Sequence, residues 1–81
     1  MQHVVYVLES ESHGRLYIGV SSNLEQRMRL HNAGRVRSTK YYRPYRLVGC
    51  KEFDSFAEAR RAEVSLKRFK DPARVRSWIL A

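Results

Sequence analysis

The chain has 81 residues, 43% of them hydrophobic, which suits one small folded domain over residues 1–81. No apolar stretch approaches the ~20 residues that cross a bilayer, and the N-terminus lacks the basic leader of a signal peptide, so we expect a cytoplasmic protein with no membrane contact. Sixteen Lys and Arg residues against eight Asp and Glu give a net charge of +8; twelve of the sixteen are Arg, and residues 26–51 contain no acid. Because clustered arginines bind phosphates, nucleic acid is the expected partner.

The first two predicted elements form a hairpin. Residues 3–8 and 16–20 are rich in β-branched and apolar side chains, and the polar segment between them contains Gly14. If the connecting loop is roughly symmetric, Tyr6 and Tyr17 lie near each other, on the same face of an antiparallel pair.

A helix is predicted after the hairpin. Ser22 and Glu25 fit a capping box at its start, and Gly34 is placed to end it in a left-handed conformation. Arg27 and His31 are four residues apart, so they share one helix face.

A basic loop, residues 35–44, precedes a third predicted strand at residues 45–53. This strand is apolar enough that we expect it to be central or buried in the sheet. Its cysteine, Cys50, is the only one in the chain, which excludes an internal disulfide and a cysteine-based zinc site. We interpret it as a structural thiol because no neighbouring histidine would activate it.

Two further helices complete the predicted fold. Ser55 and Glu58 form a second capping box, and Asp71 followed by Pro72 is typical of a helix start. Glu63 lies at the edge of the apolar stripe of the first of these helices. The predicted class is therefore α/β (α+β): a three-stranded antiparallel sheet flanked by helices, in the order β-β-α-β-α-α.

The remaining chemistry points to phosphodiester cleavage. The sequence lacks Walker-type, GxGxxG, HExxH and EF-hand motifs, and its histidines lack metal-ligand spacing. It has two strand tyrosines, an Arg and a His on one helix face, and a carboxylate in a basic helix. Hydrolysis of a phosphodiester needs a proton path for water, an Arg for the developing charge and a divalent ion, for which one Glu suffices.

Five segments in the right order resemble the GIY-YIG nuclease superfamily, and among its members the small standalone bacterial proteins similar to the N-terminal nuclease module of the excision-repair incision protein. They are Val4-Val5-Tyr6, Tyr17-Ile18-Gly19, Arg27-x-x-x-His31 with the following Asn32-x-Gly34, Ser38-Thr39-Lys40-Tyr41 with Arg43-Pro44, and Ala62-Glu63-x-x-x-Lys67.

The resemblance implies the roles of four residues. Tyr6 and Tyr17 would be the two motif tyrosines, one of them helping to activate water. Arg27 would stabilise the transition-state phosphate, and His31 would serve in proton transfer.

The resemblance also implies a metal site. Glu63 would bind one Mg²⁺ or Mn²⁺ ion, and Gly19 would let the backbone pass close to the site. The basic residues of the loop and of the second helix, with one aromatic residue able to stack on bases, are the predicted nucleic-acid contacts: Arg35, Arg37, Lys40, Tyr41, Arg43 and Lys67.

The sequence thus predicts a metal-dependent endonuclease of low sequence specificity that acts on DNA in repair or processing. The chain also departs from the family pattern, with valines where the first motif has Gly and Ile, Val20 where Lys is frequent, and no Asn after Asn32. A non-catalytic nucleic-acid-binding module on the same fold is therefore the alternative function, and a basic domain that docks on an acidic protein is a third. Taken singly, the two tyrosines could be packing residues, and Glu63 could form surface ion pairs with Arg60 or Lys67.

Overall fold

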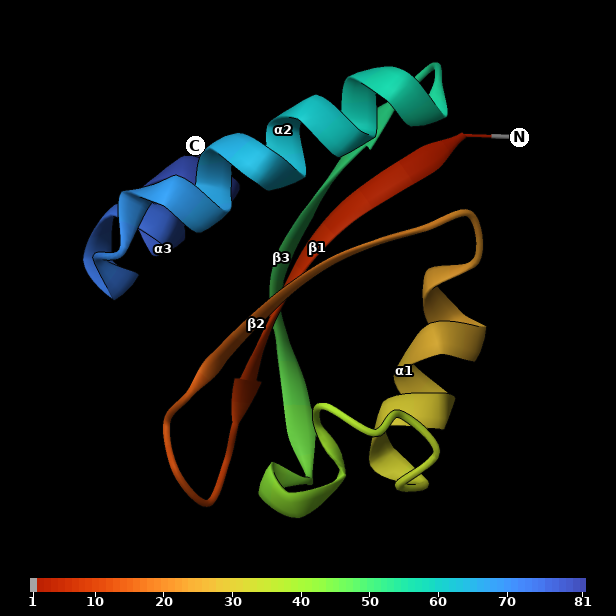
Figure 1. Ribbon diagram of the computed structural model, residues 1–81, viewed down its shortest axis with the longest axis vertical. Helices are drawn as coiled ribbons and strands as arrows, with labels where there is room; N and C mark the ends of the chain where they lie inside the picture. Colours follow the sequence, from red (N-terminus) through yellow and green to blue (C-terminus); the bar gives the residue numbers. More distant parts are fainter. Residues whose placement is uncertain (1) are drawn as a thin grey trace.

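The computed structural model describes residues 2–81 and has the predicted element order (Figure 1). Its elements are strand β1 (His3–Ser10), strand β2 (Leu16–Ser21), helix α1 (Leu24–Asn32), the 3₁₀ turn η1 (Lys40–Tyr42), strand β3 (Tyr45–Phe53), helix α2 (Phe56–Phe69) and helix α3 (Pro72–Leu80). The predicted class, an antiparallel three-stranded sheet flanked by helices, is confirmed.

The central strand is β1, and the sheet order is β2-β1-β3. The prediction that residues 45–53 form the central or buried strand was wrong, because β3 lies at an edge and four of its nine residues are exposed. The continuous apolar run Val4–Leu8 is what a strand covered on both faces requires, whereas β3 contains Arg46, Lys51 and Glu52.

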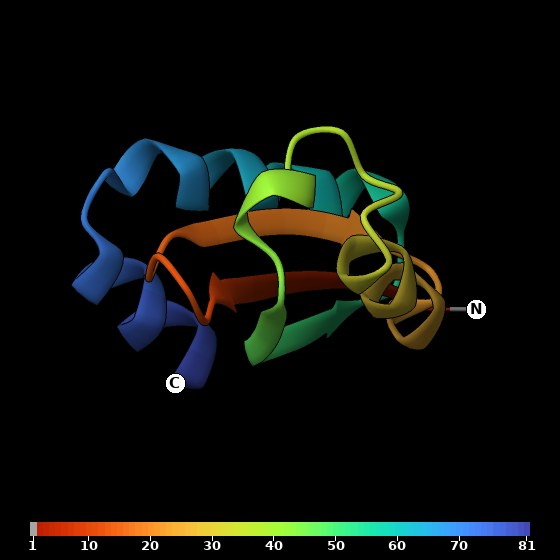
Figure 2. The ribbon, with the colours of Figure 1, turned by 90° about the horizontal axis from the view of Figure 1, so that it is seen from below.

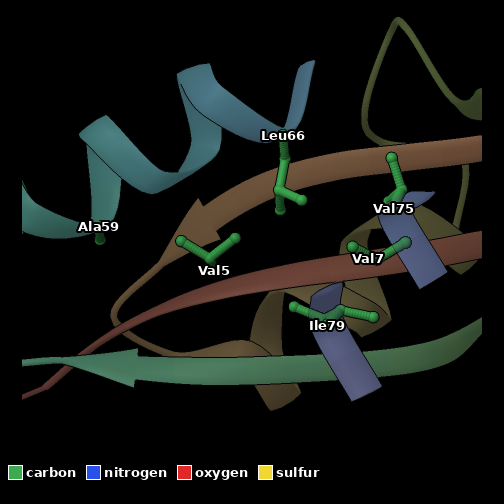
Figure 3. Close-up of a cluster of buried hydrophobic side chains, with 6 residues drawn as sticks. All are labelled: Val5, Val7, Ala59, Leu66, Val75 and Ile79. Carbon is green, nitrogen blue, oxygen red and sulfur yellow. The ribbon is translucent and has the colours of Figure 1, made fainter. Parts of the chain in front are cut away.

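Alternate residues of β1 point to two different layers. Val5 and Val7 pack under α2 and α3, where they form the hydrophobic core with Leu66, Val75 and Ile79 (Figure 3). Tyr6 and Leu8 belong to a second cluster on the opposite face, which is covered by α1 (Figure 2). One strand therefore contributes to the core and to the α1 face at the same time.

The helix starts follow local side-chain chemistry. The Ser55 hydroxyl accepts a hydrogen bond from the Glu58 amide at 3.2 Å, and the Asp71 carboxylate accepts one from the Ala73 amide at 3.0 Å, as predicted. The predicted cap at Ser22 was wrong. Asn23 caps α1 instead, accepting from the Gln26 amide at 3.1 Å, because its side-chain carbonyl reaches the third helical residue.

Cys50 was expected in a buried run, but its position on edge strand β3 leaves it exposed. Within residues 2–81, no helix has the length and apolar character needed to span a bilayer.

Candidate active site

Two tyrosines meet on the α1 face of the sheet. In the β1–β2 register, Tyr6 lies opposite Gly19 and Leu8 lies opposite Tyr17, so the tyrosines are diagonal neighbours with ring centroids 6.2 Å apart. A Cβ atom on Gly19 would lie 2.5 Å from the Tyr6 hydroxyl oxygen, closer than any side chain could be accommodated without a shift. Gly19 therefore makes the space in which the Tyr6 hydroxyl lies.

Helix α1 brings His31 onto these tyrosines. The His31 Nε2 atom lies 3.0 Å from the Tyr6 hydroxyl, and its ring centroid lies 4.9 Å from that of Tyr17. The helix is held at its C-terminal end by Asn32, whose side chain accepts from the Tyr45 amide at 2.7 Å and donates to the Tyr45 carbonyl at 3.2 Å. This double hydrogen bond ties α1 to β3 next to the histidine.

The other ring nitrogen of His31 faces Thr39, a buried residue of the basic loop. The His31 Nδ1 atom and the Thr39 hydroxyl are 2.8 Å apart, and that hydroxyl donates to the Val36 carbonyl at 3.4 Å. We assign the Thr39 proton to this carbonyl, so that the Thr39 oxygen accepts from Nδ1–H and Nε2 accepts from Tyr6. The result is a directed chain of hydrogen bonds from Tyr6 through His31 to Thr39.

Burial keeps the side chains of this hydrogen-bond chain neutral. Burial lowers the pKa of His31 to about 4, and the nearby Arg27 guanidinium contributes to this lowering. Burial also raises the pKa of Tyr6 above its ordinary value, although Arg27 acts against this. The pKa of Arg27 is itself raised, chiefly by its interaction with the Tyr6 hydroxyl, so Arg27 is a permanent cation beside both tyrosines.

Glu63 on α2 is buried, with 7% of its surface exposed, and is paired with two cations. Arg60 forms an ion pair with one carboxylate oxygen, and the Lys67 Nζ atom lies 3.3 Å from the other. The negative charge of Glu63 contributes to the raised pKa of Tyr6, so the two side chains are within electrostatic reach of each other.

The donor set around Glu63 fits a hydrated ion. Residues 2–81 contain no cluster of three or more His, Cys, Asp or Glu side chains that would enclose a metal. A Mg²⁺ or Mn²⁺ ion that keeps most of its waters needs only one carboxylate. The side chains of Arg60 and Lys67 are both more than half exposed, so they can turn to solvent and free the Glu63 oxygens.

The predicted nucleic-acid contacts lie on the loop that contains Thr39 and on α2. Arg35, Arg37 and Tyr41 are exposed, and 77% of the Tyr41 surface is accessible to solvent. The Lys40 Nζ atom lies over the Tyr41 ring, 5.0 Å from its centroid. Arg43 also has a structural role: its guanidinium donates to the Lys40 carbonyl at 2.6 Å and packs against Gly34. Lys67, on α2, is the partner of Glu63 described above.

Comparison with known proteins identifies this arrangement. Residues 2–75 match the family described as the GIY-YIG catalytic domain. The chain belongs to the GIY-YIG family. This is a nuclease family, and its substrates are nucleic acids.

Small bacterial GIY-YIG proteins are similar to the chain over most of their length. A UPF0213 protein of Staphylococcus haemolyticus is 39% identical over 69 residues, covering 84% of this chain and 83% of the relative. A UPF0213 protein of Streptococcus pneumoniae is 39% identical over 71 residues, covering 84% and 69%. The solution NMR structure of a UPF0213 protein of Bacillus halodurans has 35% identity and a TM-score of 0.52, covering 84% and 72%.

Four of the GIY-YIG motif side chains thus come together in contact or electrostatic range: Tyr6, Tyr17, Arg27 and His31. Thr39 was not predicted as a site residue, although it lies in one of the segments that carried the resemblance. No spacing rule pointed to it, because it lies in an irregular loop and reaches His31 only through the tertiary fold.

Proposed function

We propose that this GIY-YIG domain, residues 1–81, is a divalent-metal-dependent endonuclease that hydrolyses DNA phosphodiester bonds. The observation that carries the proposal is the buried hydrogen-bond chain from Tyr6 through His31 to Thr39, with the Arg27 cation beside it. A packing tyrosine needs no histidine held in one tautomer, whereas a residue that relays a proton does.

The proton movement follows from the donor directions. In this relay the Tyr6 hydroxyl, which donates to Nε2 of His31, would accept a proton from the attacking water. As that proton arrives, the hydroxyl proton passes to Nε2, and the neutral tyrosine is restored. Tyr17, whose ring lies beside the same histidine, is the alternative residue to receive the proton from water.

In the site without substrate, protonation of His31 is unfavourable. Burial lowers the pKa of His31 to about 4 and raises that of Tyr6 above its ordinary value, so placing a proton on His31 carries a free-energy cost in the free site. A bound phosphate brings negative charge next to His31, which raises its pKa and lowers that cost. Proton transfer would therefore accompany substrate binding.

Arg27, together with a metal ion held by Glu63, would stabilise the negative charge that develops on the phosphate. The Arg27 guanidinium, with its planar fork of donors, would bind the non-bridging oxygens as negative charge develops. Glu63 would hold one Mg²⁺ or Mn²⁺ ion, which when bound polarises the phosphate and assists the leaving oxygen.

Contacts to DNA would come from the exposed cations of the loop after α1 and from Lys67. Side chains of this kind bind phosphates irrespective of sequence, which supports low sequence specificity and a role in DNA repair or processing within the cytoplasm. Tyr41 would offer a surface on which an exposed base stacks.

The decisive experiment changes the carboxylate alone. Glu63→Gln should abolish Mg²⁺- or Mn²⁺-dependent cleavage of DNA, while binding measured without metal persists or tightens because one negative charge is removed. The fold should lose at most ~1 kcal/mol, since both partner cations can return to water. Glu58→Gln is the matched control: it makes the same chemical change at an exposed position on the same helix and should cleave normally.

Three outcomes separate the candidate functions. Equal cleavage by the wild type and the Glu63→Gln variant would remove Glu63 from the metal site. Salt-dependent DNA binding with no cleavage of any DNA form by either protein would favour the binding-module alternative. An absence of DNA binding would leave the basic surface free for an acidic protein partner.

A further inference from the structure

A shallow groove of about 420 Å³ runs along β2 toward the corner between α2 and α3. Its apolar wall is formed by Leu16 and Ile18 from β2, Leu66 from α2 and Val75 from α3. The volume is in the range of small-molecule sites, and a wall of this kind suits the flat face of a nucleobase.

Cations surround this apolar wall. Arg15 and Lys70 are exposed at the groove, and Lys67, a third cation of the lining, pairs with the Glu63 carboxylate. The acidic residue of the lining, Asp71, is committed to capping α3 through its hydrogen bond to the Ala73 amide. The groove is therefore apolar inside and positively charged at its rim, which complements a base with its phosphates.

The groove borders the active site at strand β2. Tyr17 is one of its lining residues and packs on His31 with ring centroids 4.9 Å apart. The Nζ atom of Lys67, another lining residue, lies 3.3 Å from a Glu63 carboxylate oxygen. A strand whose scissile phosphate is at the tyrosines would therefore have a neighbouring nucleotide near this groove.

Lys70 lies where helix α2 ends. Its φ of 58° is left-handed, and among residues 2–81 it is the one non-glycine residue with positive φ. Glycine is the usual residue at this position after a helix, because a side chain there is strained. This turn places the Lys70 cation on the groove rim.

We propose that this groove binds an unpaired nucleotide flanking the scissile phosphate, so that the enzyme prefers DNA with a single-stranded segment at the cleavage position. The proposal rests on the proposed nuclease function and specifies its substrate. A fully paired duplex stacks its base faces inside the helix, so it presents no base to an apolar wall.

Backbone amide NMR of the wild type without metal tests the assignment directly. Adding a short oligothymidylate should shift the amide signals of Ile18, Leu66 and Lys70, and a blunt duplex should shift them much less. Because the wild type is used, the result does not depend on how any variant folds.

Lys70→Gly gives a second test, in which the stability of the fold should rise while the binding of oligothymidylate weakens. Relief of the left-handed strain should raise Tm by a few degrees. Loss of the phosphate contact should reduce the slope of log affinity against log salt for oligothymidylate by about 0.7 units. Lys51→Ala, a control on the far edge strand, removes the same charge and should leave that slope unchanged.

Different results would contradict the groove proposal and the nuclease proposal. Shifts confined to residues 35–43, with unchanged binding by the Lys70→Gly variant, would overturn the groove and leave the nuclease proposal standing. If no form of nucleic acid binds the wild type, both proposals fall.

Discussion

Thr39→Val tests whether the loop threonine sets the protonation of the active-site histidine. Valine has nearly the volume of threonine, so the change removes the hydroxyl without opening a cavity. The His31 Nδ1 atom, which lies 2.8 Å from that hydroxyl, would be buried without a hydrogen-bond partner. An unsatisfied buried polar group costs about 1–3 kcal/mol, which for a domain of this size lowers Tm by about 4–8 °C per kcal/mol.

The same change would act on catalysis through the tautomer. With no acceptor at Nδ1, the proton moves to Nε2, which then donates to the Tyr6 hydroxyl instead of accepting from it. Loss of the proton acceptor should lower kcat by about 100-fold or more, with little change in KM. The measurements are urea denaturation, the ¹⁵N shifts of the His31 ring and cleavage kinetics.

Thr39→Ser is the matched control for this prediction. Serine keeps the hydroxyl and loses one methyl group, so it should cost stability of about 1 kcal/mol yet keep the tautomer and the rate. A Thr39→Val variant that retains Nδ1–H and cleaves at the wild-type rate would refute the proposed hydrogen-bond chain.

Three other predictions follow from the charges of the site. The pKa of His31 is about 4 in the folded protein and 6.5 in the unfolded chain, so the unfolded chain binds the proton more readily. About 3 kcal/mol of stability should therefore be present above pH 6.5 and be lost as the pH falls toward 4. Urea titrations should show this loss for the wild type but not for the His31→Gln variant. Arg27→Lys keeps the charge but loses the planar fork, so kcat should fall far more than DNA affinity, and equal loss of both would mark Arg27 as a binding residue only. Changing Arg35 and Arg37 together to Ala should flatten the salt dependence of duplex binding by up to ~1.8 units in anisotropy titrations, and an unchanged slope would show that the loop does not hold the phosphate backbone.

Features set by short-range chemistry were predictable from the sequence. Ser55 and Asp71 cap their helices because the acceptor and the amide it satisfies are two or three residues apart. The cap of α1 was missed because Ser22 and Asn23 are adjacent and both are good caps. The position of β3 was missed although its charged residues, set against the continuous apolar run of β1, indicated an edge strand.

The site itself was predictable only in part. The motif spacing brought Tyr6, Tyr17, Arg27 and His31 together as a hypothesis, and the fold places them in one cluster. Thr39 reaches His31 only because η1 and its loop fold back over α1, a tertiary contact with no local signature. The cations around Glu63 were foreseen as its ion-pair partners, whereas its burial depends on how α2 packs on the sheet.

The side chains of β1 alternate between the two faces of the sheet, and this limits where residues can be inserted or deleted. Val5 and Val7 support the core, while Tyr6, between them, belongs to the site, so a single inserted or deleted residue in β1 would exchange the two sets of side chains. Insertions are tolerated in the exposed connection between β1 and β2, where they leave the strand phase intact. Substitutions at Val5 and Val7 act on the core beneath α2 and α3, whereas substitutions at Tyr6 act on the site. A mutant library on this scaffold can therefore search for activity on one face of a single strand while the other face is held constant.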